Sequence, residues 1–209
     1  MNTPIQFAVF DGFDEIDVFG PLEVLAAAGY EVQLAALTPG TVTSMRGIPI
    51  KVTAVLQPAH GLIVPGGGWL DRAPRGARTE VASGLLGARL REIADSCRWV
   101  GSVCSGAMIL AHAGLLDGRA ATTNRACLAD LAPFVAEAVD ARVVDDGDRV
   151  TAGALFSGVD LGLWIVEREL GSRSSRELGA RWGYERQQSV WFADPRSRTT
   201  PRDRAPAQD

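Results

Sequence analysis

Short apolar segments alternate with longer segments of helical periodicity along most of this chain. The apolar segments are rich in β-branched residues and end at glycine, proline or aspartate turns, which is typical of buried strands. We expect strands at residues 5–10, 30–37, 62–64, 99–103 and 120–123. We expect helices at residues 22–28, 80–97, 105–113, 157–170 and 172–185. Strands that alternate with helices predict an α/β fold with a mainly parallel central sheet covered on both faces.

Two stretches depart from this alternation. Residues 42–56 predict a small β excursion, and residues 142–144 and 149–151 flank an Asp-Asp-Gly-Asp turn, which predicts a hairpin. We expect one domain over residues 1–190. Residues 191–209 are expected to form a flexible tail, because proline, charged and small polar residues dominate there and bury too little apolar surface.

Composition narrows the classes of protein that fit. The chain has 209 residues, 46% of them hydrophobic and 22% charged, which suits one domain with a full core. A net charge of -4 supplies no basic surface for nucleic acid, and no apolar run is long enough to span a bilayer. The first residues do not resemble a signal peptide, and three cysteines argue against a disulfide framework. We therefore expect a cytoplasmic protein that binds neither nucleic acid nor membranes.

The most informative segment surrounds Cys104. The strand expected at 99–103 runs into Cys104, and Ser105 and Gly106 lead at once into a helix. The thiol would sit on a sharp strand-to-helix bend at the positive end of that helix, with the amides of Ser105 and Gly106 aimed at an anion. A cysteine so placed can lose its proton near neutral pH and act as a nucleophile. The alternative is a buried inert cysteine, and a structural role is favoured for the other two cysteines, which lack this context.

A proton donor or acceptor for the thiol must come from elsewhere in the chain. His112 lies on the same predicted helix, roughly 12 Å from Cys104 along the axis, and His60 precedes the strand at 62–64, whose other end faces the site. Both are poorly placed for direct proton transfer. Asp17 follows the first strand and has apolar neighbours, so its pKa is a candidate for being raised. A protonated Asp17 could hydrogen-bond a thiolate and later hand over a proton.

The glycine run at 66–68 follows another predicted strand. It lacks both the Lys-Ser/Thr ending of a P-loop and the spacing of a dinucleotide fingerprint. We expect its bare backbone to line the pocket beside Cys104 and to offer an amide to a developing negative charge. No set of His, Cys, Asp and Glu residues has zinc spacing. The expected site therefore uses no metal and no organic cofactor.

Three segments together resemble the ThiJ/PfpI superfamily, whose members are related to class I glutamine amidotransferases. They read Asp-Val-Phe-Gly-Pro-Leu-Glu-Val-Leu at 17–25, Ile-Val-Pro-Gly-Gly-Gly at 63–68 and Val-Cys-Ser-Gly-Ala at 103–107. The match extends roughly over residues 5 to 190. The resemblance implies a flavodoxin-like three-layer sandwich, a homodimer, an elbow nucleophile at Cys104 and a site that Ser105 helps to form.

Within this superfamily, the Asp-x-x-Gly-Pro and Cys-Ser-Gly forms resemble isonitrile hydratases and the sensor domains of AraC-type regulators. The hydratase resemblance implies that Asp17 is the catalytic acid and base. Relatives commonly read Thr-Thr-His-Trp where this chain reads Thr-Thr-Asn-Arg at 122–125, so Asn124 replaces a histidine. That replacement removes a general base, which weakens peptidase-type or glyoxalase-type chemistry more than it weakens hydration.

These features predict a cysteine-dependent, hydratase-like enzyme that adds water to an isonitrile and releases an N-substituted formamide. The expected catalytic residues are Cys104 and Asp17. The expected residues that bind the small-molecule substrate are Gly67, Gly68, Ser105, Thr123 and Asn124. Two alternatives stay open, namely a non-catalytic protein that senses a ligand or an oxidant, and a biosynthetic enzyme that uses another substrate on the same scaffold.

Overall fold

An eight-stranded sheet forms the centre of the molecule in the computed structural model, which describes residues 4–187 and 189–193. All strand pairs of this sheet are parallel except β10 with β11. The strands lie in the order β12 (Trp191–Phe192), β10 (Val143–Asp146), β11 (Arg149–Ala152), β7 (Trp99–Val103), β6 (Gly61–Val64), β1 (Ile5–Ala8), β2 (Val32–Ala36) and β5 (Ala54–Val55). The predicted mainly parallel sheet and the hairpin near residue 147 are confirmed.

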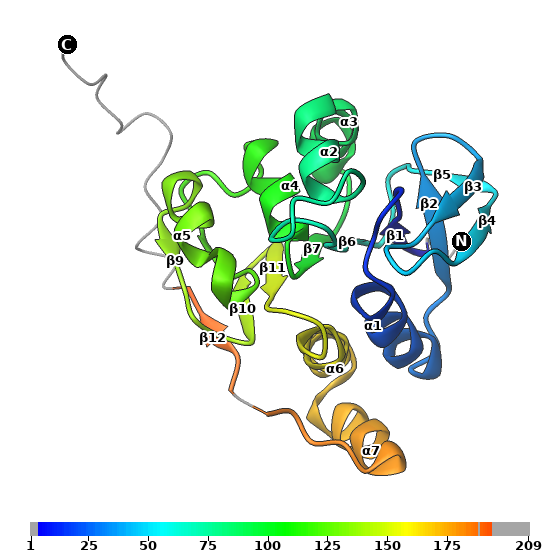
Figure 1. Cartoon of the computed structure of the whole chain (residues 1–209). Helices are drawn as coiled ribbons and strands as arrows, with labels where there is room; N and C mark the ends of the chain where they lie inside the picture. The colour runs from blue at the N-terminus through cyan, green and yellow to red at the C-terminus, as the bar shows by residue number, and fades with distance from the viewer. Residues whose placement is uncertain (1–3, 188, 194–209) are drawn as a thin grey trace.

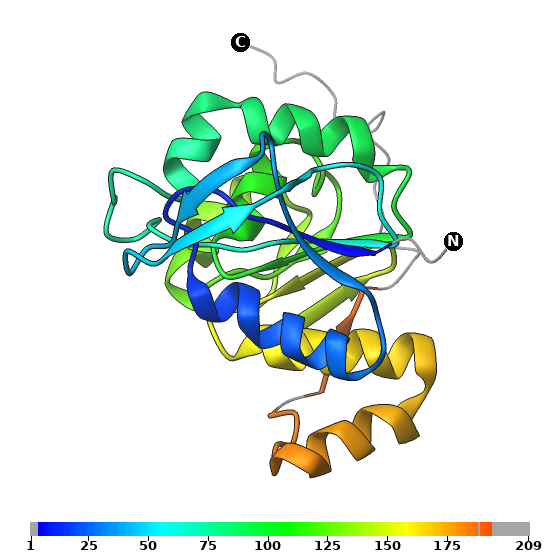
Figure 2. The same cartoon turned by 90° about the vertical axis from the view of Figure 1, so that its right-hand side faces the viewer.

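Helices cover both faces of the sheet, so the molecule is a three-layer α/β sandwich (Figures 1 and 2). One face carries α1 (Glu15–Ala27) and α6 (Ser157–Leu170), with α7 (Ser172–Trp182) packed outside α6. The opposite face carries α2 (Ala77–Ser83), α3 (Leu85–Ala94) and α4 (Gly106–His112). Smaller elements complete the chain: β3 (Gly40–Thr43) pairs with β4 (Pro49–Val52), β8 (Ala120–Ala121) pairs with β9 (Glu137–Ala138), and η1 (Arg125–Cys127), α5 (Leu128–Leu131) and η2 (Ala132–Phe134) follow β8.

The central strands are buried along their whole length. Every residue of β1, β6 and β7 is buried, and Phe7, Ile63 and Trp99 are completely inaccessible. Strands covered on both faces need continuous apolar runs rather than an alternating pattern. For this reason the sequence located these three strands to within about two residues. No helix in the described part of the chain is both long enough and apolar enough to cross a membrane.

Helix α1 begins earlier than the sequence predicted. The prediction placed its start after the Gly-Pro pair at residues 20–21, but the helix begins at Glu15 and contains Pro21. Asp14 caps it, since its Oδ1 accepts a hydrogen bond from the Ile16 amide at 3.0 Å. Pro21 only removes the bond that its amide would have donated to the Asp17 carbonyl. Asp17 therefore lies in the first turn of a helix and not in a loop.

Three other boundaries were also wrong. The helix predicted at 80–97 is two helices, because Gly84 adopts a left-handed conformation (φ 69°) between α2 and α3. The strand predicted at 120–123 ends at Ala121. The predicted flexible tail contains β12, which pairs in parallel with β10 and extends the domain beyond residue 190. The remainder of the predicted tail, residues 194–209, lies outside the described part of the chain.

Candidate active site

Cys104 occupies the sharp bend that follows β7. Its φ of 53° lies in the left-handed region, which costs a residue with a side chain about 1–2 kcal/mol. Hydrogen bonds hold this conformation from both sides. The Cys104 amide donates to the carbonyls of Ala152 (3.0 Å) and Gly153 (2.8 Å), and the Thr123 hydroxyl donates to the Cys104 carbonyl at 2.8 Å. The strand–turn–helix geometry predicted for this cysteine is confirmed.

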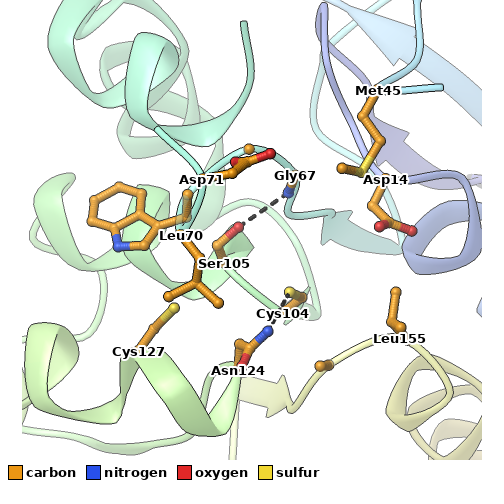
Figure 3. Close-up of a pocket in the computed structure, with 13 residues that line it drawn as sticks. Asp14, Met45, Gly67, Leu70, Asp71, Cys104, Ser105, Asn124, Cys127 and Leu155 are labelled. Carbon is orange, nitrogen blue, oxygen red and sulfur yellow. Dashed lines mark hydrogen bonds between the residues drawn. The ribbon is translucent and has the colours of Figure 1, made fainter. Parts of the chain in front are cut away.

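The Cys104 side chain opens into a cavity of about 260 Å³ at the carboxyl ends of the central strands (Figure 3). In parallel sheets this edge is where ligands bind. None of the described residues that line the cavity is basic, and two of them carry a carboxyl group. The lining residues are Asp14, Met45, Gly67, Gly68, Trp69, Leu70, Asp71, Cys104, Ser105, Asn124, Cys127, Ala154 and Leu155.

Burial controls the ionisation of the thiol. It raises the pKa of Cys104 to about 12, and the nearby carboxyl of Asp17 adds to this rise. The prediction that the helix end would make Cys104 a thiolate near neutral pH was therefore wrong. Helix α4 has only seven residues, and a helix end contributes about 0.3–1 kcal/mol, less than one pKa unit. Desolvation of a thiol that is 9% exposed outweighs that contribution.

Two N–H groups favour the ionised thiol. Nδ2 of Asn124 donates to Sγ of Cys104 at 3.7 Å, as Figure 3 shows, and the backbone N–H of Ser105 also donates to the thiol. Both interactions lower the pKa of Cys104, against the larger effect of burial. They would stabilise negative charge on sulfur when it develops during a reaction. An asparagine amide cannot take up the thiol proton, so the site needs another group for that task.

Asp17 is the group that remains. Its side chain is 0% exposed, and the pKa of its carboxyl is raised well above the usual range, mainly by burial and then by the negative charge of Asp14. Oδ2 accepts a hydrogen bond from the Gly66 amide at 2.9 Å, whereas Oδ1 is buried with no hydrogen-bond partner among the described residues. A proton on Oδ1 fits this arrangement, because Oδ2 already acts as an acceptor. The Cys104 thiol lowers the pKa of Asp17, and the carboxyl of Asp17 raises the pKa of Cys104.

Four of the five predicted binding residues line the cavity, and Thr123 does not. The Thr123 hydroxyl donates to the Cys104 carbonyl, so this residue helps to hold the bend. The Gly67 amide donates to Oγ of Ser105 at 3.0 Å. The glycine loop and the Cys104 bend are thereby locked together, and Gly68 and Asn124 stay beside the open space.

The two histidines lie away from the cavity, as their positions in the sequence predicted. His112 ends α4, where its Nδ1 contacts the Met108 carbonyl at 2.8 Å. His60 lies at the other end of β6, and its Nε2 is 2.8 Å from Oε2 of Glu169. Neither belongs to the cavity lining. The described residues also contain no group of three or more His, Cys, Asp or Glu residues that could hold a metal ion.

Several cavity residues were missed from the sequence. Asp14 was not among the expected site residues, and it lines the cavity from the N-cap position of α1. Cys127 was assigned a structural role, yet its thiol lies on the wall of the cavity that contains Cys104 (Figure 3). Met45 and Leu155 come from distant loops, and nothing in the sequence around them indicates that they line the cavity. Trp69, Leu70 and Asp71 directly follow the glycine run.

Comparison with known proteins gives consistent results. The model of the DJ-1/PfpI family matches residues 4–168. The chain is 34% identical over 176 residues to an isonitrile hydratase from Pseudomonas putida. This match covers 82% of this chain and 74% of the relative. It is also 29% identical over 168 residues to a deglycase from Pyrococcus horikoshii, covering 78% of this chain and 95% of the relative.

Solved structures show the same fold. A ThiJ/PfpI family protein from Pseudomonas syringae superposes with a TM-score of 0.79 and 27% identity, over 90% of this chain and 77% of that chain. DJ-1beta from Drosophila melanogaster superposes with a TM-score of 0.76 over 88% of this chain and 100% of that chain, at 22% identity. The second likeness concerns the fold alone.

Proposed function

The chain belongs to the DJ-1/PfpI family, and from this premise we propose that it adds water to an isonitrile to give an N-substituted formamide. Its relatives include enzymes with different activities, so the family alone does not choose the reaction. The observation that carries the proposal is the buried pair of Cys104 and Asp17, in which burial favours the neutral form of both groups. Such a pair supplies a nucleophile and an acid without a histidine.

Isonitrile chemistry suits this pair. The terminal carbon of an isonitrile carries a lone pair, and once it is protonated it becomes open to a nucleophile. Asp17 would donate the proton on Oδ1 to this carbon, and Sγ of Cys104 would form the C–S bond. The thiol proton returns to the Asp17 carboxylate, so the step adds S–H across the carbon and leaves a thioimidate. A thiol with a high pKa is no obstacle, because its proton leaves as the new bond forms.

Water completes the reaction. The thioimidate nitrogen takes a proton from Asp17 while water adds to the carbon and gives a proton back to Asp17. The C–S bond then breaks, the hydroxyl proton passes to the departing sulfur, and the formamide is released. Over the cycle one isonitrile and one water become one formamide, with no change of oxidation state. The proposed reaction therefore needs no cofactor, and the N–H groups of Asn124 and Ser105 favour charge on the departing sulfur.

The cavity supports a small uncharged substrate. Its described lining contains Asp14 and Asp71 but no basic side chain, and apart from the amide of Asn124 the rest of the lining is apolar or small. An anionic substrate would be repelled and would find no cation to bind. A short alkyl or aryl isonitrile fits the cavity volume of about 260 Å³ and needs no cation for binding, because it is uncharged.

The test is turnover of a simple alkyl isonitrile, followed by formamide production. We expect the wild type to form the formamide and both Cys104→Ala and Asp17→Asn to lose at least about a hundredfold in kcat/KM. The same preparations are assayed for removal of glycation adducts, the activity that the name of the archaeal relative indicates. Undiminished isonitrile turnover by Cys104→Ala, or deglycation as the only activity, would reject the proposal.

We extend the proposal to a homodimer. Ile16, Phe19, Leu155 and Phe156 expose 38%, 41%, 37% and 58% of their surface, although all four are large and apolar. They lie on α1 and just before α6, two helices that pack side by side (Figures 1 and 2). We call these four residues the α1–α6 patch. A second copy of the chain would cover this patch next to the cavity, which Leu155 also lines.

A further inference from the structure

Asp14 and Asp17 form a linked carboxyl pair around the glycine loop. The Asp14 amide donates to the Gly66 carbonyl at 2.8 Å, and the Gly66 amide donates to Oδ2 of Asp17 at 2.9 Å. The Asp14 side chain caps α1 by accepting from the Ile16 amide, and it also accepts from the backbone N–H of Asp17. The N-cap residue and a residue of the first turn thus hold their carboxyl groups near each other, and the charge of Asp14 acts on Asp17.

We propose that Asp14 is a positioning residue whose negative charge keeps Asp17 in its acid form. The role rests on the proposed function only in so far as that acid protonates the substrate. Nothing in the expected chemistry of the site required a second carboxyl group. Asp14 lines the cavity but sits beside the Cys104–Asp17 pair, where its charge can act on both.

The surroundings decide which carboxyl ionises first. Burial raises the pKa of the half-buried Asp14, with a smaller rise from Glu15, but two backbone hydrogen bonds and the charge of Arg46 act against that rise. Asp17 is fully buried, and its Oδ1 has no hydrogen-bond partner among the described residues. The groups acting on Asp17 are Asp14, the thiol of Cys104 and the backbone of Gly66 and Leu155, none of which is a cation. Asp14 therefore loses its proton at the lower pH.

The consequence is an acid that persists to a higher pH. Two neighbouring carboxyl groups resist ionising together, so the charge of Asp14 adds to burial in raising the pKa of Asp17. The same charge raises the pKa of Cys104. Removing it lowers both values, so the protonated Asp17 is then lost at a lower pH. The alkaline limb of the activity profile would move in the same direction.

The experiment compares Asp14→Asn with the wild type in the whole chain. Asparagine caps a helix as well as aspartate does, so this variant removes the charge and keeps the cap. The titration of Asp17 is followed by NMR of 13Cγ-labelled aspartate, with its resonance assigned by its loss in Asp17→Asn. We expect the midpoint of Asp17 to fall by about one pH unit or more. The pH midpoint of Cys104 alkylation by iodoacetamide should fall with it.

Two further variants separate charge from structure. Asp14→Ala should lower both midpoints as Asp14→Asn does and should additionally lower the melting temperature, because the cap is lost. Asp11→Asn is the matched control, since Asp11 is exposed in the same loop and accepts a hydrogen bond from the Thr43 amide. It should leave the Asp17 midpoint unchanged.

An Asp17 midpoint in Asp14→Asn that stays within about 0.3 pH units of the wild type would overturn the proposal. A midpoint that falls equally in Asp11→Asn would also overturn it, because the effect would then be one of general charge. These readouts do not depend on the substrate. If the midpoints shift but no isonitrile is turned over, the proposed function fails and the role of Asp14 stands.

Discussion

Burial rather than the helix end sets the chemistry of Cys104. Cys104 and Asp17 could both be proposed from the sequence, because apolar neighbours and a strand–turn–helix pattern are local signals. The sequence predicted a lowered pKa for the Cys104 thiol, but burial raises this pKa to about 12. The residues that bury the thiol come from segments far apart in the chain, so no local pattern indicates them. Asn124 donates a hydrogen bond to the sulfur.

Replacing Asn124 by aspartate tests this hydrogen bond. Asn124→Asp keeps the side-chain oxygen that accepts from the Ala126 amide at 3.0 Å, but it exchanges the donor to Cys104 for a negative charge. A hydrogen bond to a charged group contributes about 1.5–3 kcal/mol, so alkylation of Cys104 by iodoacetamide at fixed pH should slow at least about tenfold. The rate is measured by intact-protein mass spectrometry, with Cys104→Ala as the background. An unchanged rate would show that Asn124 does not stabilise the thiolate.

At the scale of elements, the site depends on two turns that interlock. The loop after β6 and the bend after β7 meet where Gly67 donates to Ser105. Both turns were predictable, since each follows a short buried strand and consists of small residues. The start of α1 was not, because the choice between Asp14 and the Gly-Pro pair depended on whether Pro21 could be tolerated inside the helix. This start places Asp17 in the first turn of α1, where it is completely buried and is not among the residues that line the cavity.

Substituting Gly66 tests the interlock. A Cβ on Gly66 would lie 2.5 Å from the Ser105 amide nitrogen and 2.6 Å from its Oγ, so Gly66→Ala must displace the Cys104 bend. We expect a loss of stability of about 1–3 kcal/mol in denaturant unfolding, together with loss of activity. Gly40→Ala is the control, because a Cβ there meets nothing within 4 Å, and it should change stability by less than about 0.5 kcal/mol. Equal stability of the two variants would contradict the packing described for the bend.

For the whole molecule, alternation of strands and helices predicted the layers correctly. The sequence did not reveal that β12 joins the sheet edge beyond β10, because its two residues follow no periodic pattern long enough to detect. It also could not assemble the cavity wall, which combines loops that begin near residues 14, 45, 67, 104, 124 and 154. Tertiary packing brings these loops together. No local pattern in the sequence shows that they meet.

The α1–α6 patch predicts an oligomer. Phe19→Asp and Phe156→Asp each place a charge in the proposed interface, so light scattering coupled to size exclusion should show a dimer for the wild type and a shift to monomer for both variants. Leu85→Asp is the control, since Leu85 is 66% exposed on α3 at the opposite face, and it should stay dimeric. A monomeric wild type, or dimers in both phenylalanine variants, would contradict the proposed homodimer.

In the proposed reaction, Cys104 forms a covalent bond to the substrate carbon. The most direct measurement is intact-protein mass spectrometry after brief exposure to a simple alkyl isonitrile and an acid quench. The wild type should gain the mass of one isonitrile, mapped by peptide analysis to Cys104. Cys127→Ala, which removes the other thiol of the cavity, should gain the same mass, and Cys104→Ala should gain none. An adduct that maps to Cys127, or formamide production by Cys104→Ala at the wild-type rate, would contradict the account.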